Sequence, residues 1–422
     1  MQNYINLGQK GHELSKNVIM IFKHTRLITL LIIMSSTMVC AQNIYDSKFQ
    51  WKMPGGKYIN PVSFFSMHGY VNAVFAGPSP QWTASNFNGL GMPGQVLVPN
   101  TNNSSFQNDE ALWISSELTE NTSILMELHL VASPSGTGMA GPGGLTIVLT
   151  EANANWKIYK NYANISVGTF WSPFGIHNQD WLGAQNLFSL MPLASGAYPT
   201  HYNEKGIRLD GLLSHGENWG LNYVMSLGNG YDAWDISGYK SWDMNENKTF
   251  NSRVSVFPGF GENLNIGFSY ANGLINEGDT LSSINSSTYY DLSFNSIGID
   301  LKATTKFVEL RSYAILTQKN YQSPVSRFVA NDNVTGLMCE MSKPIEFKEN
   351  KWCRSIVPKL RWDYLLNDKN FLVSNAVELS TISFGMNFHI NKSFNFSVDY
   401  NVLNEIDDFN NNRLITRVSA EF

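Results

Sequence analysis

Cysteine, charge and long apolar segments are all scarce in this sequence of 422 residues. Only 3 cysteines are present, and the two distal to the amino-terminal region, Cys339 and Cys353, are expected to be out of register across a turn, so no disulfide framework is predicted. Charged residues make up 15% of the chain, the net charge is −5, and no basic run occurs, which argues against a nucleic-acid partner. Beyond the first forty residues no apolar stretch reaches about 18 residues, which excludes a membrane helix there.

The amino-terminal residues have the features of a secretory signal. Lys23 and Arg26 precede an apolar run over 27–39, and the small-residue site around Ala41 predicts cleavage before Gln42. Met20 is then a plausible translation start, so we expect residues 1–41 to be an extension plus signal peptide. A lipoprotein anchored through Cys40 is the alternative, but the residues before Cys40 lack the Leu and the small side chain usual at such sites.

The carboxy-terminal residues alternate between two faces and end on an aromatic side chain, Phe422. Leu414, Thr416, Val418 and Ala420 share one face, whereas Arg413, Arg417, Ser419 and Glu421 share the other. This is the period of a β-strand. Such an ending resembles outer-membrane β-barrels, whose last strand pairs with the first so that no open edge is exposed to lipid.

The chain between the signal and Phe422 reads as two-faced segments joined by connections that alternate between long and short. Turn-forming residues fill the short connections, and Asn, Gly, Ser and Asp fill the long ones. We therefore predict a transmembrane antiparallel β-barrel over residues 62–422, preceded by a short periplasmic segment over 42–61. The sixteen predicted strands lie at 62–76, 109–118, 121–133, 144–158, 161–172, 203–214, 218–228, 248–258, 262–272, 288–302, 306–317, 333–345, 352–366, 375–390, 392–404 and 412–422.

One face of these segments suits lipid and the other suits water. Ile382, Phe384 and Met386, for example, alternate with Ser383 and Asn387. Each apolar face covers ~9 to 11 residues, the length that a tilted strand needs to cross a bilayer. A water-soluble sandwich with these faces packed inward is the alternative, but it gives no reason for long and short connections to alternate so regularly.

Three short motifs resemble the phosphate-selective porin O and P family. They are Gly69-Tyr70-Val71-Asn72, the run from Val167 through Trp171-Ser172-Pro173-Phe174-Gly175, and Ser226-Leu227-Gly228-Asn229-Gly230. The resemblance implies a sixteen-stranded barrel, usually trimeric, through which small solutes diffuse. Phosphate selectivity in that family depends on ladders of Arg and Lys inside the pore, and this chain has no evident Lys cluster.

Ionisable residues on the polar faces are the candidates for lining a pore. Several are spaced two residues apart on one face, so we expect Arg208 with Asp210, Glu309 with Arg311, and Arg361 with Asp363 to pair and to leave a weakly selective lumen. The candidate pore-lining residues are Arg208, Asp210, Arg253, Glu309, Arg311, Lys359, Arg361 and Asp363.

The long connection from Trp171 to Asn203 is more apolar than a fully solvated loop. It contains Leu187, Phe188 and Leu190, and we expect it to pack inside the barrel and narrow it. Candidate residues for the constriction are His177, Asp180 and His201, any of which is also suited to capping a turn.

The sequence thus predicts an outer-membrane porin that passes small hydrophilic solutes or anions, phosphate among them, without a cofactor or a metal. Its expected partners are those solutes, outer-membrane lipid and two further copies in a homotrimer. Two alternatives stay open: a non-conducting barrel used as an adhesin or surface scaffold, and an outer-membrane hydrolase that depends on His129. The hydrolase lacks support because neither a Gly-x-Ser-x-Gly nor a His-Glu-x-x-His motif occurs.

Overall fold

In the computed structural model the chain divides into two units, one up to Ser66 and one from Met67, and each is described by itself. In the first unit, strands β1 (Trp51–Lys52) and β2 (Tyr58–Ile59) form a two-stranded antiparallel sheet. The residues described are 51–52, 58–59, 65–76, 105–132, 145–176, 187–190, 192–197, 203–215, 219–229, 248–258, 264–276, 291–322, 329–347, 353–368, 377–405 and 412–422.

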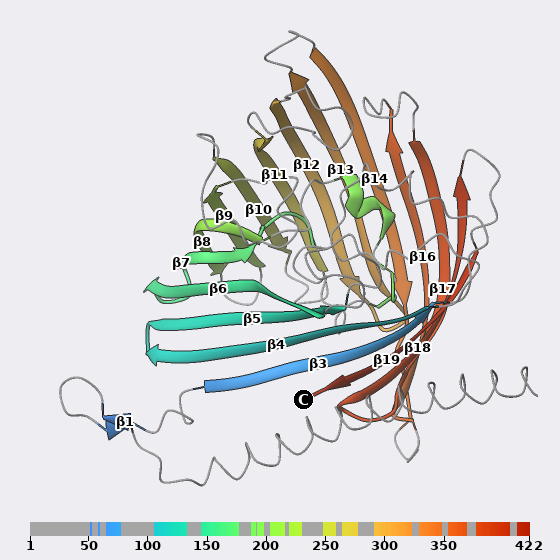
Figure 1. Ribbon diagram of the computed structural model, residues 1–422, viewed down its shortest axis with the longest axis horizontal. Coiled ribbons are helices and arrows are strands. Elements are labelled where there is room, and N and C mark those ends of the chain that lie inside the picture. The colour runs from blue at the N-terminus through green and yellow to red at the C-terminus, as the bar shows by residue number, and fades with distance from the viewer. Residues whose placement is uncertain are drawn as a thin grey trace, which may run out of the picture. The chain divides into compact units, whose positions relative to one another are not determined.

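The second unit is a closed antiparallel barrel of sixteen strands, as the sequence predicts (Figure 1). A further two-residue strand, β15 (Ile345–Glu346), continues β14 along β16. The barrel strands are β3 (Phe65–Ala76), β4 (Ser105–Thr119), β5 (Thr122–Ala132), β6 (Leu145–Tyr159), β7 (Ala163–Trp171), β8 (Asn203–His215), β9 (Trp219–Gly228), β10 (Thr249–Phe257), β11 (Leu264–Asn276), β12 (Asp291–Thr304), β13 (Glu309–Gln322), β14 (Val329–Ser342), β16 (Ser355–Asn367), β17 (Val377–His389), β18 (Phe394–Glu405) and β19 (Arg413–Glu421).

The last strand closes the barrel against the first. Strand β19 pairs with β3, with Glu421 opposite Tyr70. Beyond this pair, the Gly69 and Phe422 amides each donate to the other residue's carbonyl at 3.0 Å. A side chain at position 69 would collide with the Phe422 ring, because an added Cβ would lie 2.6 Å from it. Closure leaves no unpaired strand edge in the barrel, which lipid requires.

Connections at one rim are short and those at the other are long. Strands β4 and β5 are joined through 120–121, β6 and β7 through 160–162, whereas 77–104 separate β3 from β4 and 229–248 separate β9 from β10. The predicted alternation is confirmed. Short connections in such barrels face the periplasm and long ones face outside.

Several strands extend further toward the long-loop rim than the sequence predicts. Strand β13 continues to Gln322 rather than 317, β14 begins at Val329 rather than 333, and β4 begins at Ser105 rather than 109. The added residues are mostly polar on both faces. The period-two signal arises only where one face meets lipid, so it disappears where a strand continues in register beyond that zone.

Apolar side chains point out of the barrel and polar ones point in. On β17 the outward Ile382, Phe384 and Met386 are 44–49% exposed, whereas the inward Ser383 is 0% and Asn387 is 7% exposed. An exposed apolar surface around a polar interior is the reverse of a soluble sandwich, so that alternative is wrong.

No helix among the described residues is long and apolar enough to cross a membrane. Cys339 and Cys353 are both free thiols, in agreement with the expected absence of a bridge between them.

Candidate functional site: the barrel interior and its inserted loop

The chain turns into the barrel directly after β7. The Trp171 indole N–H donates to Glu127 Oε2 on β5 at 2.8 Å. Four residues later Gly175 has φ of 64°, a left-handed conformation that favours glycine, and its amide donates to Ser269 Oγ on β11 at 2.9 Å. The segment after β7 therefore crosses the interior to reach strands on another part of the wall.

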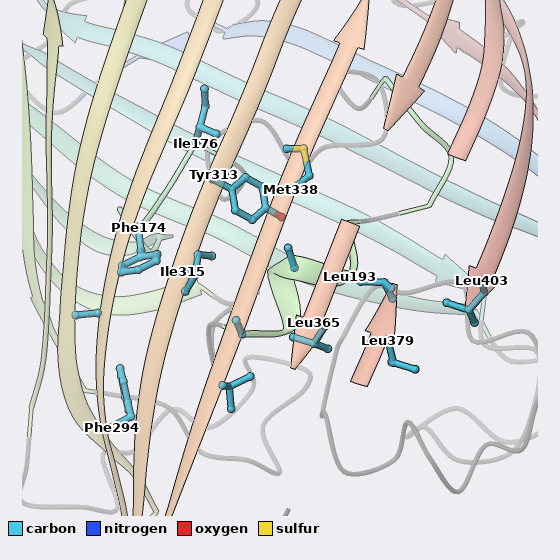
Figure 2. Packing of buried hydrophobic residues seen from close by; sticks show 14 residues of the cluster. Phe174, Ile176, Leu193, Phe294, Tyr313, Ile315, Met338, Leu365, Leu379 and Leu403 are labelled. Atoms are coloured by element: carbon cyan, nitrogen blue, oxygen red, sulfur yellow. The ribbon is translucent and has the colours of Figure 1, made fainter. Parts of the chain in front are cut away.

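An apolar cluster holds this loop in place. Phe174 lies against Gly298 of β12, where an added Cβ would be 3.0 Å from the ring. Figure 2 shows Phe174, Ile176 and Leu193 among side chains of the strands. The inward residues of the cluster come from β11 to β18: Ala271, Phe294, Tyr313, Ile315, Val334, Met338, Leu365, Leu379 and Leu403.

A short 3-10 helix, η3 (Leu193–Ala197), packs the loop against the wall of the barrel. All five of its residues are buried, and it contacts β13, β14, β16 and β17. Gly336 on β14 allows this approach, because an added Cβ would overlap the Ala194 carbonyl oxygen and lie 2.8 Å from Ala197 Cβ. Any side chain at position 336 would displace η3.

Polar groups on β16 to β18 bind the loop backbone ahead of η3. Lys359 Nζ donates to the Leu187 carbonyl at 2.5 Å, and Asn387 Nδ2 donates to the same oxygen at 3.1 Å. In the opposite direction the Ser189 amide donates to Asp399 Oδ2 at 2.8 Å. The loop backbone therefore both accepts hydrogen bonds from inward side chains and donates one to an inward side chain.

A second cation clamps the same stretch of loop. Arg361 Nη1 donates to the Leu190 carbonyl at 2.9 Å. Phe188, which is 1% exposed, lies against both cations: its ring centroid is 4.6 Å from Lys359 Nζ and 4.6 Å from Arg361 Cζ. Cation–π contacts are strongest when desolvated, so Phe188 helps these hydrogen bonds to anchor residues 187–190.

Two buried ion pairs pass over glycines and so link strands that are not neighbours. Lys359 Nζ on β16 lies 2.6 Å from Asp399 Oδ1 on β18, across Gly385 of β17. Arg253 Nη2 on β10 lies 2.6 Å from Asp300 Oδ1 on β12, with Gly267 of β11 between them. An added Cβ on Gly267 would be 2.5 Å from both partners, so the missing side chain makes the bridge possible.

A carboxylate bridges strands in the same way near the long-loop rim. Glu204 of β8 lies over Gly228 of β9 and accepts hydrogen bonds from Ser226 Oγ at 2.9 Å and Asn251 Nδ2 at 2.8 Å. Glu204 is 0% exposed. Sequence reasoning missed this residue, and only the opposing glycine in the neighbouring strand would have indicated it.

Glu127 and His129, two residues apart on β5, face the interior together. Glu127 Oε1 lies 3.0 Å from His129 Nε2, while its other oxygen accepts from Trp171. Tyr70 packs edge-on against the His129 ring, with centroids 6.5 Å apart. The described contacts thus link β5 to β3 and to the start of the inserted loop.

Two of the three predicted charge pairs are found among the described contacts. Arg208 Nε lies 3.2 Å from Asp210 Oδ1 and Arg361 Nε lies 2.7 Å from Asp363 Oδ2. In the strand register Arg311 stands opposite Glu340 on β14 and Lys302 on β12, and its pairing with Glu309 stays a prediction. Glu309 is opposite Ser342.

The candidate pore-lining residues differ in how much of the side chain is exposed to water. Side chains of Arg208 and Asp210 are 24% and 29% exposed, whereas Arg253, Arg361 and Asp363 are buried. The proposed constriction residues His177, Asp180 and His201 lie outside the described residues.

Comparison with known proteins gives similarity in fold without similarity in sequence. No protein-family model matches the chain, and no curated protein matches it. Among solved structures, OmpF of Salmonella typhi in complex with daunomycin has a TM-score of 0.55 at 12% identity, covering 85% of this chain and 97% of that chain. A loop L8 deletion mutant of OmpT, an outer membrane protein of Vibrio cholerae, has a TM-score of 0.52 at 7% identity, covering 85% of this chain and 99% of that chain. The outer membrane channel DcaP of Acinetobacter baumannii has a TM-score of 0.51 at 9% identity, covering 85% of this chain and 97% of that chain.

The chain has the fold of bacterial outer-membrane barrels. Its outer surface is apolar, its sheet is closed, and its connections are short at one rim and long at the other. All three features suit a barrel that spans the outer membrane, so the protein is an outer-membrane protein. The more specific resemblance to the phosphate-selective porin O and P family is matched by no family model and stays a prediction.

Proposed function

We propose that the protein is a porin whose passive diffusion path is narrowed by the loop between β7 and β8. The observation that carries this proposal is the anchoring of the loop across the interior, at Ser269 on β11 and again at Lys359 and Asp399 on β16 and β18. A loop fixed at both places reduces the open cross-section, so size is the first basis of selection.

The charge arrangement supports weak selectivity rather than a phosphate-specific path. Lys359, Arg361, Arg253 and Arg208 each contact a carboxylate within the barrel. A cation paired in this way attracts a passing anion much less than an unpaired one, because the fields of the two charges largely cancel. We therefore expect small hydrophilic solutes of either sign to pass.

A second candidate function is a non-conducting surface scaffold, and one observation favours it. Inward polar groups that would touch water in an open pore are almost fully buried: Arg361 is 1% exposed, and Asp363, Glu127 and Glu204 are 0% exposed. An interior packed in this way is suited to supporting external loops that bind a partner.

Single-channel recording in a planar bilayer separates the two functions. Refolded protein, verified by the heat-dependent shift of its mobility on a gel, should give discrete steps with a zero-current potential near zero across a salt gradient. Phe188→Ala should raise the conductance by releasing residues 187–190, whereas Phe384→Ala, on the outward face of β17, should leave the step size unchanged. Silence from folded wild-type barrels would reject the channel and leave the scaffold.

Two further expectations rest on the sequence and have direct tests. Assembly into a homotrimer would appear as a threefold mass in light scattering of the detergent complex. Signal cleavage before Gln42 would appear in the amino-terminal sequence of protein isolated from membranes.

A further inference from the structure

A lysine and aromatic cluster lies at the short-turn rim, on the lipid-facing side of the barrel. It consists of Lys306 and Phe307 in the turn between β12 and β13, and Lys343 just after β14. Lys306 Nζ lies 4.7 Å and Lys343 Nζ lies 5.9 Å from the centroid of the Phe307 ring. Two ammonium groups from different hairpins therefore converge on one ring.

Backbone hydrogen bonds hold the cluster in place. Thr305 Oγ1 accepts from the Phe307 amide at 3.1 Å and from the Val308 amide at 3.0 Å, which fixes the turn that presents the ring. The Lys343 amide donates to the Pro358 carbonyl on β16 at 3.2 Å. The positions of the two lysines are thus set by ordered backbone.

Among the described residues, no carboxylate forms an ion pair with either of the two positive charges. Within the described part of the chain neither Lys306 nor Lys343 forms an ion pair, and both side chains are exposed. Like charges that approach one ring repel each other unless an anion lies between them. The cluster therefore favours an anionic group at this point of the surface.

Apolar side chains continue from the cluster onto the barrel wall. Phe307 is 65% exposed, and Met341, Ile345 and Phe347 are 40%, 44% and 37% exposed. Exposed aromatic rings at a strand end mark the boundary between lipid tails and headgroups, where lysines also lie. An anionic headgroup near the lysines would place its acyl chains along this apolar strip.

We infer that Lys306, Lys343 and Phe307 form a binding site for the phosphate headgroup of an anionic phospholipid in the periplasmic leaflet. The lysines bind the phosphodiester, the ring holds them in position, and the residues from Met341 to Phe347 contact the acyl chains. This inference rests on the membrane barrel alone and is independent of whether the lumen conducts.

The test is lipid retention measured by native mass spectrometry. Delipidated protein would be mixed with dioleoyl phosphatidylglycerol and dioleoyl phosphatidylcholine, which differ only in their headgroups. Wild type should retain phosphatidylglycerol preferentially. Each lysine near an anionic headgroup contributes about fivefold, so Lys306→Ser with Lys343→Ser should reduce the preference by roughly 25-fold.

A matched double variant controls for net charge. Lys157→Ser with Lys392→Ser removes two other exposed lysines from the same rim and should keep the wild-type preference. Phe307→Ala, which keeps both charges, should weaken it. Equal loss in the two double variants, or no phosphatidylglycerol preference in wild type, would overturn the inference, as would a preference unchanged in the Lys306 and Lys343 variant.

Discussion

The ion pair between Lys359 and Asp399 is the most direct test of how the loop is held. Lys359 Nζ contacts three acceptors, namely Asp399 Oδ1 at 2.6 Å, Asn387 Oδ1 at 2.5 Å and the Leu187 carbonyl at 2.5 Å. Both side chains of the pair are at most 1% exposed. Lys359→Met leaves a buried carboxylate without its cation, and Asp399→Asn leaves the cation without its anion. Each change should cost about 3 to 5 kcal/mol of unfolding free energy.

The double variant should cost much less than the sum of the single variants. With both charges gone, no uncompensated ion stays buried, and the amide oxygen introduced by Asp399→Asn still accepts from the Ser189 amide. We expect a coupling energy of about 3 kcal/mol, measured by denaturant unfolding of barrels folded in phospholipid vesicles and followed by tryptophan fluorescence.

Arg208 and Asp210 supply the matched control. Their side chains are 24% and 29% exposed, so solvent screens the pair and the same cycle should give only about 0.2 to 1 kcal/mol. If the costs of Lys359→Met and Asp399→Asn add in the double variant to within about 0.5 kcal/mol, the two charges are not coupled and the ion pair does not hold the loop.

Two other predictions concern small changes at buried positions. Gly336→Ala should destabilise the barrel by about 1 to 3 kcal/mol, because the new Cβ would overlap a backbone oxygen of η3; Gly220→Ala, whose nearest atom is 3.6 Å away, should stay within about 0.5 kcal/mol in the same unfolding assay. Glu204→Gln should leave the free energy of unfolding unchanged or raise it, since Oε1 accepts no hydrogen bond from the described residues. Glu204→Ala should lower it by about 1 to 3 kcal/mol, because the buried donors that Glu204 binds would be left unpaired. A destabilised Gln variant would show that the charge is needed.

Local spacing predicted some of the interior contacts and missed others. The pairs Arg208 with Asp210 and Arg361 with Asp363 form because residues two apart on a strand share a face. The same rule did not find the pairing of Lys359 with Asp399, since these residues lie on strands separated by a third. A pattern read along one strand contains no information about which strands will be two places apart.

The barrel itself follows from local features of the sequence. Alternating polarity, turn residues and unequal connections set the number of strands and the direction of each face, because lipid requires every backbone group to be paired and every outward side chain to be apolar. These are local requirements, so they are visible in local patterns.

The path of the loop and the pairing of the charges depend instead on the assembled barrel. Lys359 and Leu187 are 172 positions apart, and Ser189 and Asp399 are 210 apart. Their contacts depend on strand register, on the curvature of the closed sheet and on glycines that leave room above a strand. Each of these is fixed only when all the strands are in place, which is why the interior arrangement could not be derived from the sequence.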